Sequence, residues 1–100
     1  MARQRELEPI HPGEILLEEF MKPMGISTNR LARELGVPPG RISAITNGKR
    51  SISADTALRL GKYFGVSAET WTGLQADFEL RLVRRTTGAE IDRQVREHVA

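Results

Sequence analysis

The sequence predicts an all-α domain of five short helices, followed by a short and possibly helical C-terminal tail. Apolar residues recur at intervals of three and four, which is the spacing of one helix face. Proline, serine or threonine stands before these runs and glycine after them, and no segment alternates like a strand. With 100 residues, of which 39% are hydrophobic, the chain can bury one modest core. We therefore expect one domain over residues 10–82, between an N-terminal arm (1–9) and a tail (83–100).

The first two helices are predicted by local start and stop signals. Pro12 suits the first position of a helix, where no amide hydrogen is needed, and Gly25 ends the segment. A second helix begins at Ser27 or Thr28 and ends at Gly36, since glycine readily adopts the left-handed closing conformation. The side chains expected to face inward are Ile15, Leu16 and Phe20 in the first helix and Leu31, Ala32 and Leu35 in the second.

Three more helices follow from the same signals. Pro39 suits a first helical position and keeps Pro38 out of the α region, as a residue before a helix should be. Apolar residues then repeat at helical spacing in two longer segments. The expected ranges are Pro39 to about Asn47, Ser51 or Ser53 to Gly65, and Ser67 to about Leu82.

The tail carries a weaker helical signal. Residues 87–90, Thr-Gly-Ala-Glu, have the spacing of a capping box, which predicts the start of a separate short helix. Ile91, Val95 and Val99 would form a thin apolar stripe on it. An isolated helix of this length is marginal in water, so we expect it to fray unless it docks on something.

Basic residues concentrate in the middle of the chain. Residues 1–27 carry three basic and five acidic side chains, and residues 63–100 carry five and six. Residues 28–62 carry seven basic residues against two acids, Glu34 and Asp55, for a net charge of +5. A basic middle between mildly acidic flanks favours a polyanionic partner, although a solvated charged surface would give the same count.

Several kinds of site are excluded by composition. There is no cysteine, which removes disulfides and thiolate metal sites and favours a reducing cytosol. The only histidines, His11 and His98, lack an acid cluster at ligand spacing, so we expect no metal and no cofactor. Adjacent Glu18 and Glu19 diverge by about 100° on a helix and cannot serve one reacting centre. No apolar run approaches a membrane span, and no catalysis is expected.

The positions of four residues relative to one another predict a helix-turn-helix. Ala32 is small enough for two helices to cross closely, and Gly36, four residues later, supplies a positive φ in the turn. Ile42 lies six residues beyond Gly36 and Ile45 three further on, and both would fix the second helix to the core. In this geometry the second helix enters the major groove of DNA while the first crosses the backbone.

The outward edge of the second helix has the side chains of a DNA reader. If Ile42 and Ile45 point inward, Arg41, Ser43, Ala44 and Asn47 turn outward. Small side chains let the helix approach base edges, and an alanine can meet a thymine methyl group. Arginine can pair with guanine and asparagine with adenine, each pair contributing about 1–3 kcal/mol of discrimination.

Phosphate contacts are expected on either side of this edge. Lys49 and Arg50 follow the second helix and can neutralise phosphates. Pro38 offers no side-chain cap, so the amides of Gly40 and Arg41 are expected to lack local partners and to bind an anion. The complete set of candidate DNA-binding residues is Thr28, Arg30, Pro39, Gly40, Arg41, Ser43, Ala44, Asn47, Lys49 and Arg50.

Three stretches together resemble a known family. They are HPGEIL (residues 11–16), RLARELGVPPGRISAITNGKRSIS (30–53) and ADTALRLGKYFGVSAETWTGLQADFEL (54–80), and they are similar to HigA-type, VapI-like antitoxins of the Xre family. This resemblance implies a five-helix Cro/C1 (lambda-repressor-like) domain in the bacterial cytoplasm, associated with the nucleoid through its operator. It also implies a dimer that represses its own operon at a palindromic operator and neutralises a HigB toxin, a RelE-like messenger-RNA endonuclease.

The last predicted helix carries more apolar surface than a small core needs. Trp71 is expected in the core. A palindromic operator requires a two-fold dimer with recognition helices about 34 Å apart. We therefore assign Leu74, Phe78 and Leu82 to the dimer interface, and leave Arg84 and Arg85 in solvent.

Two alternative functions remain open. One is an orphan Xre-family regulator without a toxin, which the neighbouring gene would decide. The other is a helical protein–protein adaptor that does not bind DNA. Steep salt dependence of promoter binding would favour DNA contact, because neutralised phosphates release counterions.

Overall fold

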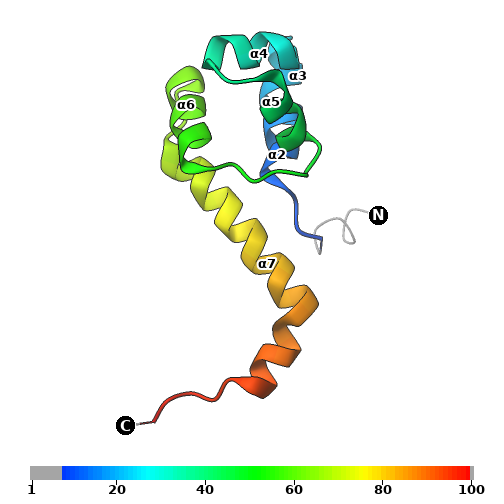
Figure 1. The fold of residues 1–100 in the computed structure, drawn as a ribbon, viewed down its shortest axis with the longest axis vertical. Coiled ribbons are helices and arrows are strands. Elements are labelled where there is room, and N and C mark those ends of the chain that lie inside the picture. Colours follow the sequence, from blue (N-terminus) through cyan, green and yellow to red (C-terminus); the bar gives the residue numbers. More distant parts are fainter. Residues whose placement is uncertain (1–7, 100) are drawn as a thin grey trace.

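The computed structural model describes residues 8–99, and within that range it consists of five helices without a strand (Figure 1). The first helix is formed by three consecutive elements, and the others are single. The all-α, five-helix prediction is confirmed, while most of the predicted N-terminal arm lies outside the described residues. The elements are α2 (Pro12–Ile15), η1 (Leu16–Met21), α3 (Lys22–Met24), α4 (Thr28–Leu35), α5 (Pro39–Thr46), α6 (Ala54–Phe64) and α7 (Ala68–Gln94).

A π-helical segment, η1, forms the middle of the first helix. The amide of Lys22 donates to the carbonyl of Leu17, five residues back. Pro23 follows directly; it has no amide hydrogen, and its ring displaces the carbonyl four residues before it, which accounts for the wider turn. The helix ends at Gly25 with φ 66°, as the sequence predicts.

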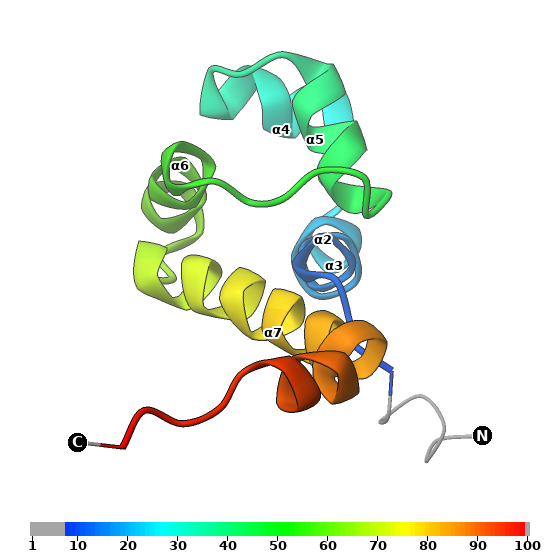
Figure 2. The same ribbon diagram turned by 60° about the horizontal axis from the view of Figure 1, so that its bottom comes forward.

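The core lies where all five helices meet. Figure 2 shows α4 and α5 at the top of the domain and α7 along the bottom, with α6 on one side between them and α2 and α3 on the other. Helix α6 makes its largest contact with α7, and α4 with α5. The buried apolar side chains are Leu16, Met21, Ile26, Leu31, Ala32, Leu35, Val37, Ile42, Ile45, Ile52, Ala57, Leu60 and Trp71.

One glycine sets the distance between the first helix and α5. A Cβ atom placed on Gly13 would lie 1.8 Å from the carbonyl oxygen of Ile45, so only glycine fits there. Since the contact is with backbone, no side-chain rotation relieves it. Gly13 therefore allows the end of α5 to rest directly on α2.

The last helix is longer than the sequence predicts. Helix α7 runs without interruption to Gln94, so its expected end near Leu82 and a separate tail helix are both wrong. Thr87 does not cap a new helix; its hydroxyl donates to the carbonyl of Val83 at 3.2 Å, one turn back in the same helix. Val95 is extended and Val99 lies further on, so only Ile91 of the expected tail stripe is helical.

The second half of α7 leaves the body of the domain (Figure 1). From residue 79 to its end nearly every residue of this helix is exposed. Leu80, Val83 and Ile91 are among the exposed large apolar side chains. None of the helices within residues 8–99 is long and apolar enough to span a membrane.

Candidate nucleic-acid interface

Helices α4 and α5 form the predicted helix-turn-helix. The side chain of Ser27 accepts a hydrogen bond from the amide of Arg30 and so caps α4. Gly36 closes α4 with φ 75°, and the amide of Val37 donates to the carbonyl of Ala32 at 2.9 Å. Ala32 itself is fully buried, as a close helix crossing requires.

The inward and outward sides of α5 lie largely as predicted. Ile42 and Ile45 are fully buried in the core. Ser43 and Asn47 are exposed on the opposite side, and Ala44 is half-buried between them. The second helix of the pair thus presents an edge of short, mostly polar side chains to the outside.

Arg41 departs from the predicted orientation. Its side chain is only 23% exposed, and Nη1 donates to Oδ2 of Asp55 at 2.7 Å. Its Nε is buried without a partner among the described residues. The expectation that Arg41 turns freely outward is therefore wrong in this structure, because a carboxylate in the first turn of α6 attracts its guanidinium.

The start of α5 also differs from expectation. The amide of Arg41 is not an orphan, since it donates to the carbonyl of Pro38 at 3.0 Å. A tight i→i+3 bond in the first turn supplies this partner without any capping side chain. Pro39 does occupy the first helical position, and both it and Gly40 are exposed.

The turn after α5 is closed by its own backbone. Gly48 adopts φ 75°, and its amide donates to the carbonyl of Ile45 at 3.0 Å. The amide of Lys49 donates to the carbonyl of Ala44 at 2.9 Å. Lys49 and Arg50 are exposed, and no carboxylate of residues 8–99 forms an ion pair with either. Both cations are therefore available to phosphates.

Helix α7 holds the far end of this loop in place. The buried side chain of Gln75 accepts from the amide of Ile52 at 2.9 Å and donates to Oε2 of Glu79 at 3.0 Å. The hydroxyl of Ser51 donates to the same oxygen at 3.2 Å. Sequence reasoning did not identify Gln75, because its partner lies 23 residues away and no local pattern signals the contact.

His11 supports the loop from the opposite side. Its Nδ1 accepts from the amide of Gly13 at 2.9 Å, which caps α2, and its ring packs edge-on against Phe78 with centroids 4.9 Å apart. Burial lowers the pKa of His11, while a hydrogen bond to the backbone of Arg50 and the charge of Glu79 oppose the shift. His11 thus caps α2 and lies beside the turn that carries Lys49 and Arg50.

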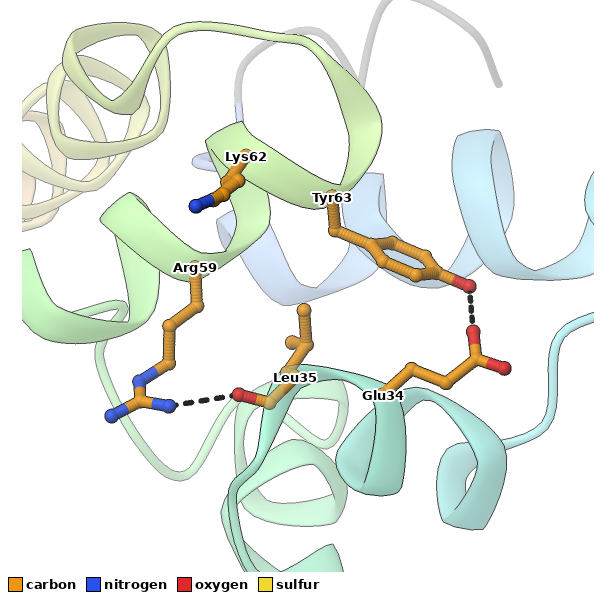
Figure 3. A pocket seen from close by; sticks show the side chains of 5 residues that line it. All are labelled: Glu34, Leu35, Arg59, Lys62 and Tyr63. Atoms are coloured by element: carbon orange, nitrogen blue, oxygen red, sulfur yellow. Dashed lines mark hydrogen bonds between the residues drawn. The ribbon is translucent and has the colours of Figure 1, made fainter.

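The start of α4 carries the other predicted contacts. Thr28 is half-buried and Arg30 is exposed. Nε of Arg30 donates to Glu34 at 3.2 Å. Tyr63 of α6 donates to the same carboxylate, as Figure 3 shows. The hydrogen bond from Tyr63, followed by that from Arg30, lowers the pKa of Glu34.

A shallow hollow of about 450 Å³ lies beside this network. Figure 3 shows Glu34 and Leu35 on one side of it and Arg59, Lys62 and Tyr63 on the other. Nη1 of Arg59 donates to the carbonyl of Leu35 at 2.8 Å and so satisfies the end of α4. Among residues 8–99, no group of three potential ligands could hold a metal ion.

The proposed dimer residues have different surroundings. Trp71 is in the core, as expected. Leu74 and Phe78 are half-buried, and Leu74 packs against the core while Phe78 contacts His11. Only Leu82, which is 41% exposed, projects freely.

Comparison with known sequences identifies a family and several relatives. The helix-turn-helix family matches residues 17–71. Virulence-associated protein I of Dichelobacter nodosus is 48% identical over 84 residues, covering 84% of this chain and 78% of the relative.

Two solved structures extend the likeness to nearly the whole chain. An addiction-module antidote protein of the HigA family from Coxiella burnetii has a TM-score of 0.86 and 45% identity, covering 91% of this chain and 99% of that one. The Pseudomonas aeruginosa antitoxin HigA, solved with the higBA promoter, has a TM-score of 0.88 and 40% identity, covering 92% and 100%.

Proposed function

The chain belongs to the helix-turn-helix family of the Xre type, within its HigA (VapI-like) group, and from this premise we propose that it is an operator-binding antitoxin. Its family consists of DNA-binding regulators rather than enzymes. In this proposal the chain represses its own operon as a dimer, works in the cytoplasm on nucleoid DNA, and neutralises a HigB-type toxin.

The observation that carries the DNA-binding part is the outward edge of α5. Two buried isoleucines, Ile42 and Ile45, fix the helix, and the opposite edge and the following turn hold residues that are small, polar or basic. The unpaired cations Lys49 and Arg50 end that edge. This arrangement suits a major groove, where small side chains permit close approach and cations meet phosphates.

The proposed dimer uses α7. Leu82 projects from the domain next to the half-buried Leu74 and Phe78, so a second copy could cover the three together. The exposed Leu80 lies nine residues after Trp71, about two and a half turns, and therefore faces away from the core. A two-fold pair of such helices would present two α5 helices to the two halves of a palindrome.

The toxin part of the proposal rests on likeness alone. Antitoxin HigA-1 of Vibrio cholerae is 33% identical over 78 residues, and its name supplies the expectation of a toxin. An Escherichia coli relative, 36% identical, is named only as an uncharacterised HTH-type transcriptional regulator. The alternative to an antitoxin is an orphan Xre-type regulator without a toxin. Co-expression with the neighbouring small gene and capture of a stable complex would support the antitoxin. If the chain binds its promoter but retains no toxin, it is an orphan regulator.

Promoter binding tests the DNA-binding part directly. We expect a gel-shift titration with the gene's own promoter to show tight binding that weakens steeply between 50 and 200 mM salt, because each neutralised phosphate releases counterions.

Two variants separate phosphate contacts from base contacts. Lys49→Ala should weaken binding to all DNA sequences similarly and reduce the salt slope by about one. Asn47→Ala should instead relax preference at one base pair, by about 1–3 kcal/mol. Binding that ignores salt would favour a protein adaptor.

The dimer is tested by a charge at its proposed centre. Leu82→Glu should shift the protein from dimer to monomer in light scattering and weaken binding to a two-half-site operator more than to a single half-site. Leu58→Glu is the matched control, since Leu58 is an exposed leucine of α6, away from the proposed interface. A dimer that survives Leu82→Glu would remove this interface from the proposal.

A further inference from the structure

The two acids of the basic segment are not free surface charges. Glu34 accepts a hydrogen bond from Arg30 and Asp55 accepts one from Arg41, and both arginines are candidate DNA contacts. Each carboxylate also has a second partner: Tyr63, on α6, for Glu34, and Arg59, four residues later in the same helix, for Asp55. The pair of Asp55 with Arg41 has the stronger geometry, at 2.7 Å against 3.2 Å for the pair of Glu34 with Arg30.

Asp55 is itself held in position. Nε and Nη2 of Arg59 donate to its two oxygens at 2.9 and 3.5 Å. The same guanidinium donates through Nη1 to the carbonyl of Leu35, at the end of α4. Through Arg59, the carboxylate that receives Arg41 is therefore linked to the end of α4 as well as to its own helix, α6.

The guanidinium of Arg41 consequently has little freedom. Nη1 already donates to Asp55, and Nε is buried and cannot reach a base. The edge of the guanidinium that presents Nε–H together with one Nη–H is therefore closed to an incoming acceptor. Only the remaining hydrogens of Nη1 and Nη2 can face DNA, in a direction that Asp55 determines.

We propose that Asp55 is a positioning residue for Arg41: by holding Nη1 it fixes which edge of the guanidinium faces the operator, and so influences base preference without touching DNA. This inference rests on the proposed function, since it presumes that α5 meets operator DNA. It adds a determinant of specificity that lies on α6, outside the helix-turn-helix.

Charge and positioning make different predictions for a variant of Asp55. Removal of a negative charge near DNA strengthens binding to every sequence to a similar degree, because phosphates are the same everywhere. Release of Arg41 changes preference only at the base pairs that Arg41 approaches. Asp55→Asn changes both the local charge and the position of Arg41. Asp55→Glu keeps the charge and moves the carboxylate by one methylene, so it changes the position alone.

The experiment measures affinity for the operator and for a panel of its single-base-pair variants. The proteins compared are the parent, Asp55→Asn, Asp55→Glu, Arg41→Ala and the double variant Asp55→Asn/Arg41→Ala. Asp77→Asn is the matched control, because Asp77 pairs with Arg81 four residues later on α7 with the same exposed geometry as Asp55 with Arg59. It removes one carboxylate without freeing Arg41.

Both Asp55 variants should change base preference at the positions that Arg41→Ala affects. In the double-mutant cycle, coupling between Asp55→Asn and Arg41→Ala should change affinity by about twofold or more, since the range for residues in contact is about two- to 150-fold. Asp77→Asn should leave the preference profile unchanged. A uniform change across the panel, or effects that simply multiply in the double variant, would overturn the proposal.

A measurement without DNA separates this proposal from the proposed function. In the folded parent, the Nε–H of Arg41 should exchange slowly in nitrogen-edited NMR spectra, because it is buried. Asp55→Asn should accelerate its exchange at least about tenfold, while Asp77→Asn should not, and the same spectra report that each variant is folded. If the parent fails to bind its promoter, the proposed function and the base-reading role are lost. If the parent binds and Arg41 is equally mobile in all variants, only the role of Asp55 is lost.

Discussion

The helix-turn-helix and the far half of α7 have opposite relations to the rest of the molecule. The ends of α4 and α5 are held by contacts from other helices, such as Gly13 against the carbonyl of Ile45 and Arg59 against the carbonyl of Leu35. Beyond residue 79, α7 is held by its own helical bonds and by i,i+4 pairs such as Gln94 with Glu90. The position of the first region depends on tertiary packing, and the form of the second depends on local propensity.

This difference implies that equal substitutions should have unequal costs in the two regions. A glycine, an isoleucine and a glutamine each occur in both an interlocked setting and an exposed one. Comparing the members of each pair measures how much of the candidate DNA interface is maintained by its support.

The largest difference is expected for glycine. Gly13→Ala should lower the free energy of unfolding by about 3 kcal/mol or more, because its Cβ meets a backbone carbonyl at 1.8 Å. Gly88→Ala, within α7 and with only a side-chain carbon of Arg84 at 3.8 Å, should raise it by about 0.5–1 kcal/mol through helix propensity. Urea unfolding followed by circular dichroism measures both. A tolerated Gly13→Ala would show that α2 and α5 are not in direct backbone contact.

Isoleucine should give the next largest difference. Ile45→Ala should cost about 2–5 kcal/mol of unfolding free energy, because Ile45 is fully buried. Ile91→Ala should stay within about 0.5 kcal/mol, since its side chain is exposed in α7. Measuring both at low protein concentration keeps self-association out of the comparison. A large effect of Ile91→Ala under those conditions would mean that the far half of α7 packs on the domain.

Glutamine should show a smaller effect. Gln75→Ala removes the acceptor of the Ile52 amide, and we expect a cost of about 1–3 kcal/mol because a buried donor is left unpaired. It should also weaken promoter binding, since the loop that carries Lys49 and Arg50 loses its support. Gln94→Ala, whose amide reaches only Glu90 on the surface, should change neither property. If promoter binding survives Gln75→Ala unchanged, the loop is held by its backbone alone.

The smallest effect concerns pH. The pKa of His11 lies below 6.5 in the folded chain, so the unfolded chain takes up a proton first as pH falls. The contribution of His11 to the free energy of unfolding should therefore be fully present above pH 6.5 and decline as the pH falls from there towards the pKa of the folded state. In His11→Asn the cap no longer titrates, and this part of the decline should disappear from melting curves between pH 7.5 and 5.5. An identical slope in the variant would assign the decline to other groups.

The sequence predicts the first region well for a physical reason. Ala32, Gly36, Ile42 and Ile45 are each required by local geometry, and all four have the predicted burial or conformation. The outward edge follows from helix periodicity once its inward side is known. Periodicity does not identify the partner of a long side chain, so it predicts an outward Arg41 although Asp55, 14 residues later, attracts its guanidinium.

The second region was mispredicted for the opposite reason. Thr87 and Glu90 have the spacing of a helix start, but such a start requires the preceding helix to have ended. Nothing between Leu82 and Thr87 breaks a helix, and Gly88 alone costs only about 1 kcal/mol. The signals at residues 87–90 do not meet that condition, and the helix continues through them.

The meeting of Gly13 with the Ile45 carbonyl also bears on how such a regulator acquires new targets. The contact joins main chain to main chain, so it is indifferent to the chemical identity of Ser43, Ala44 and Asn47 on the other side of α5. Those three positions can therefore be exchanged, by evolution or by engineering, while the mounting of the reading helix stays the same. Retargeting the protein to a different promoter would therefore require substitutions on the exposed edge of α5 only, and the backbone contact that positions the helix would stay the same.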